Sequence, residues 1–393
     1  MSNWKKCTIG DLCSAISETY KGKDEKVVLI NTSDVLNGIV LNHEKVDNKN
    51  LKGQFKKTFK KNDILYSEIR PANKRFAFID FEETSNYIAS TKLMVLRHNE
   101  NVLPEYLFAI LKSNKVIEEL QHLAETRSGT FPQITFSSEL ASMEIDLPDK
   151  NIQAKIVDIL KCIENKIKIN NEINDNLLEQ ALTMYATQFA ALNRNGCIGD
   201  YCSVKSGFAF KSSWWTTVGV KVIKIGSINQ DNLNLLECSY VDADKIDKAK
   251  DFKVNAGDLL IAMTGATIGK FAMVPYSSEL LLVNQRVGKF FLGNNPVEKL
   301  PFIYCTLKQP DVYYEIVNRG QGSAQPNISA SDIMSIPCVI PSKEVVNKFN
   351  ETVQPLFDLI ICNQRENQQL STLRDSLLPK LMSGELDVSS IDL

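Results

Sequence analysis

The chain has 393 residues, of which 44% are hydrophobic and 23% charged, which excludes both a disulfide-stapled miniature fold and an intrinsically disordered chain. Its nine cysteines include no C-x-x-C pair and are accompanied by only three histidines, which argues against a disulfide framework and against a structural zinc site. The net charge is −2, so any affinity for phosphate has to be local.

The N-terminal segment MSNWKKCTIG lacks the apolar core of a signal peptide, and no stretch approaches the roughly 20 apolar residues that a membrane helix needs. We therefore expect a cytoplasmic protein without a membrane partner.

An internal repeat organises the chain. The segment CTIGDLCS at residues 7–14 returns as GCIGDYCS at 196–203, and KNDILYSEIRPANKRFAFID from Lys61 aligns with AGDLLIAMTGATIGKFAMVP from Ala256. FPQI at 131–134 aligns with QPNI at 325–328. The repeat predicts two similar globular domains of mixed α and β structure, residues 1–150 and 195–342. We expect a helix in each domain, the clearer one at 104–123, and short strands at 27–35, 61–68, 74–80, 219–228, 257–263, 270–276 and 281–292.

Each copy ends in a helical pattern, at residues 151–194 and 343–393, and the two patterns match at a constant shift of 193. The matched residues alternate in spacing between four and three, which is the heptad seam of a coiled coil. The first seam contains Ile156, Leu160, Ile163, Ile167, Asn170, Asn174, Leu177, Ala181 and Met184. The second seam contains Phe349, Val353, Leu356, Ile360, Asn363, Asn367, Leu370, Arg374 and Leu377.

A helix of about 40 residues is on the order of 60 Å long, longer than a compact domain is wide. Each helix therefore has to bury its seam against a helix outside its own domain, and the other long helix is the nearest partner. The paired asparagines would fix the register. The alternative is that both are ordinary core helices of a bundle. Pro355 predicts a kink or an end to the regular part, and Arg374 predicts looser pairing or contact with another protein.

Motifs for catalysis are incomplete. GATIGK at 265–270 has a glycine spacing one residue short of a phosphate-binding loop, and Phe271 stands where Ser or Thr would hold magnesium, so a turn between two strands explains it better. Pro148-Asp149-Lys150 is a fragment of a nuclease pattern, and the start of a helix is the simpler interpretation. We expect no catalytic residue and no metal site.

A basic segment favours nucleic acid binding by the first copy. Residues 49–75 contain nine Lys or Arg residues against Asp63 and Glu68. A solvated face is the alternative interpretation. SEIRPANKRF fits a strand, a turn and a strand, which would present Arg, Asn and Lys tips to phosphates or base edges.

The second copy carries different polar side chains. They include Thr264 and Thr267 on a short turn, the run Asn284-Gln285-Arg286 and the loop NRGQGSAQPNIS. Gln, Asn and Arg distinguish bases in the major groove, whereas Lys mostly contacts the backbone. Trp214-Trp215 is more consistent with a core or lid pair than with base contact. The candidate DNA-binding residues are Arg70, Asn73, Lys74, Arg75, Lys92, Lys211, Thr264, Thr267, Lys270, Gln285, Arg286 and Gln325.

Together these segments resemble the specificity subunit of type I restriction-modification systems. The resemblance is carried by SGFAFKSSWW, GDLLIAMTGATIGK, VNQRVGKFF, GQGSAQPNIS and the closing NQRENQQLSTLRDSLLPKLMSGELDV, within a tandem arrangement that spans the chain. The first copy departs most, with RPANK in place of TGATIGK.

The resemblance implies two target-recognition domains that each read half of a bipartite site on double-stranded DNA. It also implies two antiparallel coiled-coil helices, related with the domains by a pseudo-twofold axis, that set the half-site spacing and bind two methyltransferase subunits. Restriction subunits would join through that complex. S-adenosylmethionine, ATP and magnesium would belong to the partners, and this chain would bind no cofactor and catalyse nothing. The alternatives are a DNA-binding scaffold without strong sequence preference and an enzyme acting alone.

Overall fold

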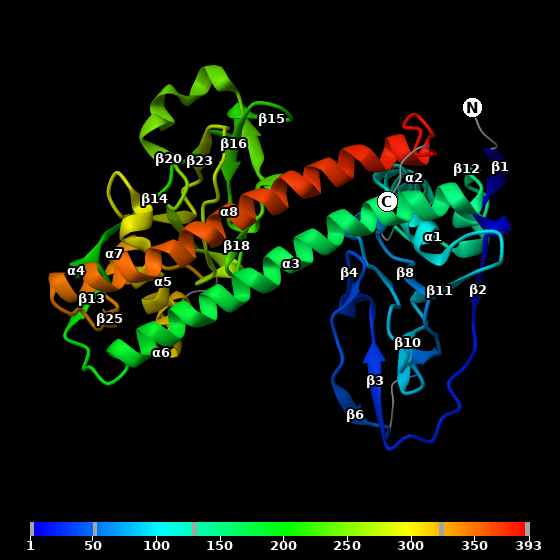
Figure 1. Cartoon of the computed structure of the whole chain (residues 1–393), viewed down its shortest axis with the longest axis horizontal. Coiled ribbons are helices and arrows are strands. Elements are labelled where there is room, and N and C mark those ends of the chain that lie inside the picture. The colour runs from blue at the N-terminus through cyan, green and yellow to red at the C-terminus, as the bar shows by residue number, and fades with distance from the viewer. Residues whose placement is uncertain (1–3, 50–52, 128–131, 322–325, 390–393) are drawn as a thin grey trace. The chain divides into compact units, whose positions relative to one another are not determined.

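The structure is a computed structural model that describes residues 4–49, 53–127, 132–321 and 326–389. The chain divides into two compact units. Unit 1 consists of Met1–Glu164 with Thr372–Leu393, and unit 2 consists of Asn165–Ser371. In Figure 1 the strands of unit 1 run from blue to cyan, and those of unit 2 from green to yellow.

Unit 1 contains two four-stranded sheets. The first sheet is antiparallel, in the order β2 (Cys13–Ile16), β11 (Leu93–His98), β8 (Ile64–Ser67) and β9 (Phe76–Phe78). The second has the order β6 (Lys45–Asp47), β3 (Lys26–Ile30), β10 (Tyr87–Ser90) and β7 (Phe55–Lys57). Strands β3 and β10 are parallel, so the chain leaves both at the same edge of the sheet.

Unit 2 has the same topology. Its first sheet has the order β14 (Ser203–Ser206), β24 (Val287–Phe291), β21 (Leu259–Ala262) and β22 (Phe271–Met273). Its second has the order β15 (Trp215–Thr216), β19 (Ser239–Val241), β16 (Val220–Ile223), β23 (Leu281–Val283) and β20 (Lys253–Val254). Strands β16 and β23 are the parallel pair, and β15 is an extra edge strand. The expected repeat of a mixed α and β domain is confirmed.

In each domain the shared I-G-D motif follows a short strand that pairs with the last strand of that domain. In unit 1, β1 (Lys5–Thr8) pairs with β12 (Glu144–Leu147), and in unit 2, β13 (Gly196–Cys197) pairs with β25 (Pro337–Cys338). Asp11 Oδ2 accepts from the Thr8 N–H at 2.8 Å, and Asp200 Oδ2 accepts from the Cys197 N–H at 2.8 Å. These backbone hydrogen bonds lower the pKa of both carboxyls. The aspartates thus fix the turn that starts each domain.

Two glycines in that motif allow a close approach. A Cβ on Gly10 or Gly199 would lie 3.0 Å from a backbone oxygen, that of Ala141 or Met334 respectively. The first segment of each domain therefore packs against the segment just before a long helix.

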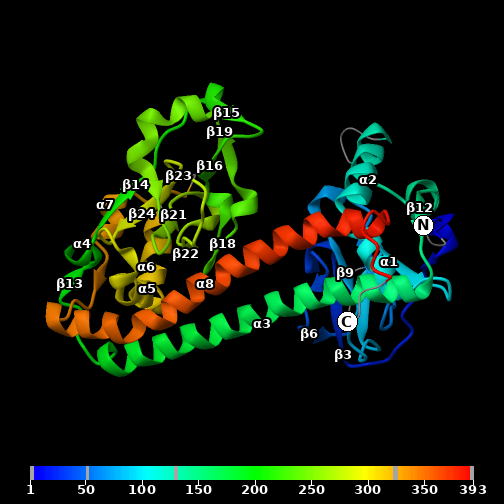
Figure 2. The same ribbon diagram turned by 45° about the horizontal axis from the view of Figure 1, so that its top comes forward.

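The expected helix at 104–123 is wrong in detail, since the structure has α1 (Pro104–Leu111) and α2 (Asn114–Arg127). The buried face of α1 ends with Leu111, Lys112 and Ser113 connect the two helices, and Asn114 and Lys115 are exposed, so the apolar stripe loses its phase. The run at 281–292 is also two strands, β23 and β24, because Asn284 to Arg286 form a turn. Unit 2 has α5 (Leu300–Leu307) and α6 (Pro310–Gly320) in place of α1 and α2, beside the start of the closing helix in Figure 1 and Figure 2.

The two long helices are α3 (Lys150–Phe189) and α8 (Lys343–Met382), each of 40 residues. Within unit 2, Asn170 Nδ2 donates to Asn367 Oδ1 at 2.9 Å, and Asn363 Nδ2 donates to Asn174 Oδ1 at 2.8 Å. From the first pair to the second, the residue number increases along α3 and decreases along α8. These parts of the two helices therefore run antiparallel, as expected. Within unit 1, Ile156 and Leu160 share a core with Leu378 and Leu381.

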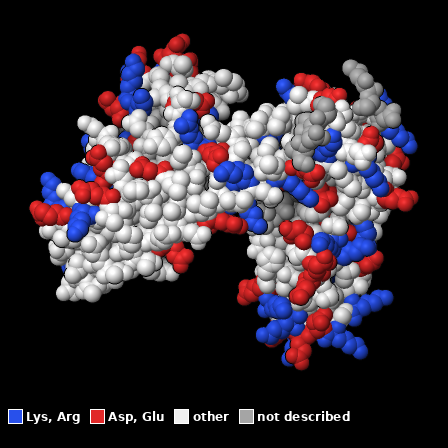
Figure 3. Space-filling model, in the orientation of Figure 1, with Lys and Arg blue, Asp and Glu red and all other residues white. Residues whose placement is uncertain are grey.

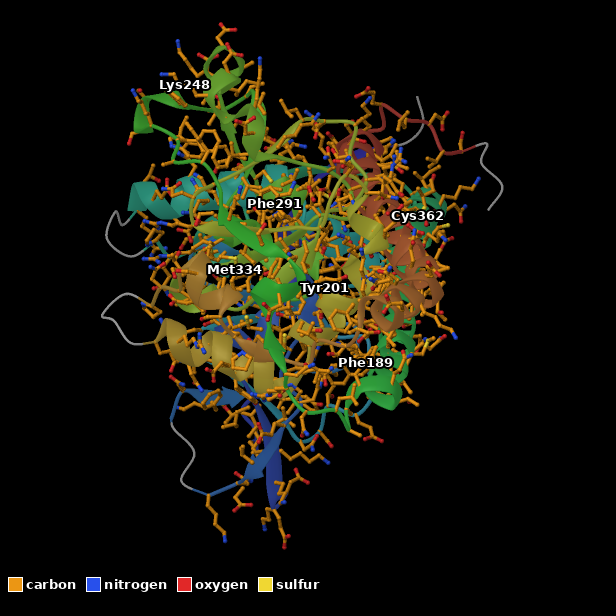
Figure 4. All side chains as sticks on the ribbon, turned by 90° about the vertical axis from the view of Figure 1, so that its left-hand side faces the viewer. Phe189, Tyr201, Lys248, Phe291, Met334 and Cys362 are labelled. Carbon is orange, nitrogen blue, oxygen red and sulfur yellow. The ribbon has the colours of Figure 1, made fainter. Side chains whose placement is uncertain are left out.

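The seam residues are buried or half-buried, with one departure from the expected pattern. Met184 is exposed, and Tyr185 is buried instead, because the last turns of α3 bury Ala181, Tyr185 and Phe189 at a spacing of four against the domain. Phe189, which is labelled in Figure 4, contacts Phe302 and Phe349, with ring centroids 5.6 and 5.2 Å apart. Pro355 is exposed and lies inside α8, so it does not end the helix.

Candidate nucleic-acid interface

A turn between β8 and β9 carries most of the basic candidates in unit 1. It contains one short helix, Pro71–Asn73, flanked by Arg70 and Lys74, whose φ angles are +46° and +52°. The Arg70 N–H donates to the Pro132 carbonyl at 3.1 Å, and the Ala72 N–H donates to Gln121 Oε1 at 3.0 Å. The turn is therefore held against α2 and the 132–134 segment by its backbone.

Three polar side chains of this turn have no partner among the described residues. Arg70 and Asn73 are exposed and Lys74 is half-buried, and within the described part of the chain none of the three side chains makes a hydrogen bond or an ion pair. Lys92 is also exposed. These tips can therefore reach a ligand without breaking an internal contact.

Two other cations of the basic segment have internal roles. The Arg75 guanidinium donates to the Ser33 carbonyl at 3.0 Å and to the Val35 carbonyl at 3.4 Å. Lys57 Nζ donates to the carbonyls of Thr91 and Leu93 at 3.0 and 2.8 Å, and burial lowers its pKa. Lys57 therefore has an internal structural role, and Arg75 braces the backbone beside the turn.

The equivalent turn in unit 2 joins β21 to β22 through the short helix Gly265–Thr267. The expectation of a turn between two strands for GATIGK is confirmed. The Gly265 N–H donates to the Pro326 carbonyl at 2.9 Å, as Arg70 does to Pro132. Thr264 pairs with Asn327, as Ile69 pairs with Gln133. The two turns thus occupy the same place in the repeated fold.

The polar side chains of the second turn are partly enclosed. Thr264 Oγ1 is buried without a hydrogen-bond partner among the described atoms, and Thr267 Oγ1 donates to the Thr264 carbonyl at 3.2 Å. Lys270 is half-buried. Gln325, another candidate, lies outside the described residues, as do Phe131 and Lys52.

A hollow of about 240 Å³ lies where the chain leaves the parallel strands β16 and β23. Because both strands end at the same edge, Lys224 and the turn at Asn284 come together. Gln285 and Arg286 are exposed on that turn, and the Arg286 N–H donates to Asn284 Oδ1 at 3.3 Å. The lining residues are Phe210, Trp215, Lys224, Ile225, Asn284, Gln285 and Arg286.

Aromatic rings form one wall of the hollow. Trp214 stacks on Phe208 with centroids 5.9 Å apart, and Trp215 packs on Phe210 at 5.6 Å. Both tryptophans are half-buried, so the expected packed pair is confirmed. Lys224 Nζ lies 3.6 Å from the centroid of Trp215, and partial burial lowers the pKa of this ammonium. Exposed Lys211 lies farther out, 5.9 Å from the Trp214 centroid.

The aspartates that precede β8 and β21, at the opposite ends of these strands from the two turns, are internally neutralised. Asp63 Oδ1 and Oδ2 accept from Arg97 Nε and Nη2 at 2.8 and 2.7 Å, and Asp258 Oδ2 accepts from Lys289 Nζ at 2.6 Å. In Figure 3 acidic and basic side chains are interspersed at the end of unit 1 that carries β3 and β6. The solvated-face interpretation therefore suits that end better than a single-sign patch.

The sequence did not lead us to predict that Lys224 and Phe210 lie beside Gln285. The available signal was that two apolar strands are each followed by a polar residue, and parallel pairing brings such ends together. Among the described residues no three His, Cys, Asp or Glu side chains are grouped to hold a metal ion. No described helix is apolar enough over sufficient length to cross a membrane.

The fold defines a class of chain built from two copies of a mixed α and β domain, each followed by a 40-residue helix. A family model for the type I restriction modification DNA specificity domain matches residues 1–179 and again residues 193–372. The chain belongs to this family of type I restriction-modification specificity subunits.

Named relatives agree with this assignment. The type I restriction enzyme HindI specificity subunit of Haemophilus influenzae is 30% identical, over 98% of this chain and all of that protein. The MjaIX specificity subunit of Methanocaldococcus jannaschii is 27% identical over 74% of this chain and 71% of that protein. A crystal structure of a type I S subunit from M. genitalium shares the fold, with a TM-score of 0.51 at 18% identity, covering 98% of this chain and 97% of that one.

Proposed function

We propose that this chain is the sequence-reading, non-catalytic subunit of a type I restriction-modification complex. Residues 1–150 and 195–342 would each act as a target-recognition domain, reading one half of a bipartite site on double-stranded DNA. Residues 151–194 and 343–393 would supply the conserved helices that set the gap between the half-sites and bind two methyltransferase subunits. Restriction subunits would join through that complex.

The observation that carries this proposal is that both domains present polar side chains at an equivalent turn. The Arg70 turn and the Gly265 turn are anchored by the same type of backbone hydrogen bond, yet their side chains differ. A turn with the same backbone structure but different side chains in each domain would allow one fold to read two different half-sites. Arg70, Asn73, Lys74 and Lys92 would act in unit 1.

In unit 2 the side chains beside the hollow are the best candidates for base reading. Gln285 and Arg286 are exposed, and both carry paired hydrogen-bonding groups that match base edges in the major groove. Lys211, Thr264, Thr267, Lys270 and Gln325 complete the proposed contact surface. Arg75 would act through the backbone that it braces.

The chemistry would belong to partners. S-adenosylmethionine, ATP and magnesium would be bound by the methyltransferase and restriction subunits, and this chain would hold none of them. The methyltransferase would flip the target adenine out of the duplex, as enzymes acting on a base must.

The test is to express the chain with its methyltransferase subunits and map methylated adenines across genomic DNA. We expect one bipartite sequence with a single gap length. Duplexes in which the gap is lengthened or shortened by one base pair should lose methylation. Equal methylation at all gap lengths contradicts the proposal, and salt-sensitive binding without sequence preference favours the scaffold instead.

The isolated chain provides a second measurement. Incubated with DNA, magnesium and S-adenosylmethionine in the absence of partners, it should neither cleave nor methylate. Turnover by the isolated chain contradicts a non-catalytic role.

A further inference from the structure

The two equivalent turns differ in one backbone feature. Gly265 and Gly269 in unit 2 have φ angles of +72° and +83°, values that glycine adopts without cost. The matching positions in unit 1, Arg70 and Lys74, hold +46° and +52° with long charged side chains. The left-handed conformation costs a residue with a Cβ roughly 1–2 kcal/mol.

The identity of these residues is unusual for their conformation. Five non-glycine residues of the described chain have positive φ angles, and three of them are Asn37, Asn62 and Asp231. Asn and Asp tolerate this region because their short side chains bond locally. Arg70 and Lys74 have no such local bond within the described residues. Glycine would fit the same backbone better, and the second copy uses it.

The stability of the fold therefore does not explain why Arg and Lys occupy these two positions. Arg70 is exposed and Lys74 is half-buried, and among the described residues neither the Arg70 guanidinium nor the Lys74 ammonium has a hydrogen-bond or ion-pair partner. The cation next in sequence, Arg75, is used internally, so it cannot replace them without releasing the Ser33 and Val35 carbonyls. A strained residue that persists at an exposed turn is a signature of a functional site.

We infer that Arg70 and Lys74 are kept in strained backbone positions because they contact DNA phosphates of the first half-site, whereas the glycine turn of unit 2 makes no side-chain contact at these positions. The inference rests on the proposed function and makes the two turns chemically unequal. Unit 1 holds its half-site through cations at these two positions, and unit 2 has glycine at both, so any contact of its turn comes from other side chains.

The experiment uses the full chain in complex with its methyltransferase subunits and a duplex carrying the mapped methylation site. The variants are R70G, K74G and the double variant, with R70K as the charge-preserving variant. N62G is the matched control, because Asn62 also has a positive φ angle of +69° but carries no charge. Two quantities are measured, the thermal midpoint of the chain and the dependence of binding on salt concentration.

Each glycine variant should raise the thermal midpoint, by about 2–4 °C for a stability gain near 1 kcal/mol. Each should also lower the slope of log affinity against log salt by about 1, and the double variant by about 2. R70K should keep the slope of the unaltered complex, and N62G should leave it unchanged. A purely structural role for either residue would not change the slope.

Two results overturn the inference. An unchanged salt slope in the double variant shows that the two cations do not contact phosphate, and a lower thermal midpoint shows that their backbone is not strained. Failure of the proposed function looks different, because the unaltered complex would then bind all duplexes alike before any variant is tested.

Discussion

Lysines 56 and 57 are neighbours in sequence with opposite surroundings. Lys56 is exposed, whereas the Lys57 ammonium lies on the carbonyls of Thr91 and Leu93. K57A should lower the free energy of unfolding by about 1–3 kcal/mol, because it leaves two carbonyls without a donor. K56A should leave stability unchanged. Urea denaturation of the two variants measures the difference, and equal stabilities would show that Lys57 has no structural role.

The same contrast marks the limit of sequence reasoning at the residue scale. A basic run reveals charge, but whether a lysine reaches solvent or a carbonyl depends on strands far apart in the chain. Lys57 and Thr91 are 34 residues apart. Arg75 was a DNA-binding candidate on charge alone, and its internal partners, the carbonyls of Ser33 and Val35, lie about 40 residues earlier in the chain.

The seam between α3 and α8 contains a polar residue that is fully buried. Asn170 donates to Asn367 Oδ1 at 2.9 Å and to Glu366 Oε2 at 2.7 Å, but its own Oδ1 is buried without a partner among the described atoms. N170L removes this unpaired oxygen, while Glu366 and Asn367 can regain water. We expect the free energy of unfolding to rise by about 1 kcal/mol.

The control for this change is N174L. Asn174 is half-buried and its Oδ1 already accepts from Asn363, so the variant removes a satisfied hydrogen bond and should gain nothing. Urea denaturation of the full chain compares the two. A loss of more than about 1 kcal/mol in N170L would show that the asparagine pair is needed for stability and not only for register.

We expect the methyltransferase subunits of the proposed complex to contact the exposed face of α3. Ile169 and Ile173 are 50% and 38% exposed and lie one helical turn apart. Changing both to Asp should abolish copurification of the methyltransferase subunit, because a charge would be buried in the contact. The thermal midpoint should not change. Q180D, at another exposed position of α3, is the control, and full copurification of the double variant would place the contact elsewhere.

At the element scale, periodicity predicted more than propensity. The alternating four and three spacing identified buried or half-buried seam positions along both helices, because that pattern reports burial directly. It failed at Met184, where the helix packs on Phe302 and Phe349 of its domain and the buried stripe follows a spacing of four. The prediction of one helix at 104–123 likewise rested on composition, and this segment has no continuous apolar stripe.

At the scale of the whole chain, the repeat was the strongest signal. It predicted that two domains share a topology, and the strand orders agree down to the parallel pair in each second sheet. It could not show which side chains surround the hollow, because Trp215, Lys224 and Asn284 come together only through strand pairing. The function was predicted from the resemblance to a family and not from any single residue.

Because each compact unit has its own core, we expect the two proposed recognition domains to read their half-sites separately. Q285A and R286A remove side chains with paired hydrogen-bonding groups from unit 2 only, so base preference should relax at one or two adjacent positions, by about 1–3 kcal/mol for each lost bidentate contact. The other half-site should stay unchanged. Mapping methylated adenines for each variant complex measures both halves in one experiment.

The matched control is K248A. Lys248 is an exposed cation of the same unit, at its outer end and far from Phe189 in Figure 4, and it lies outside the hollow. Its removal should leave the methylated sequence intact and test whether any loss of charge in unit 2 changes recognition. If Q285A changes neither half-site, the turn at Asn284 does not read bases. If it changes both, the two domains do not recognise DNA independently.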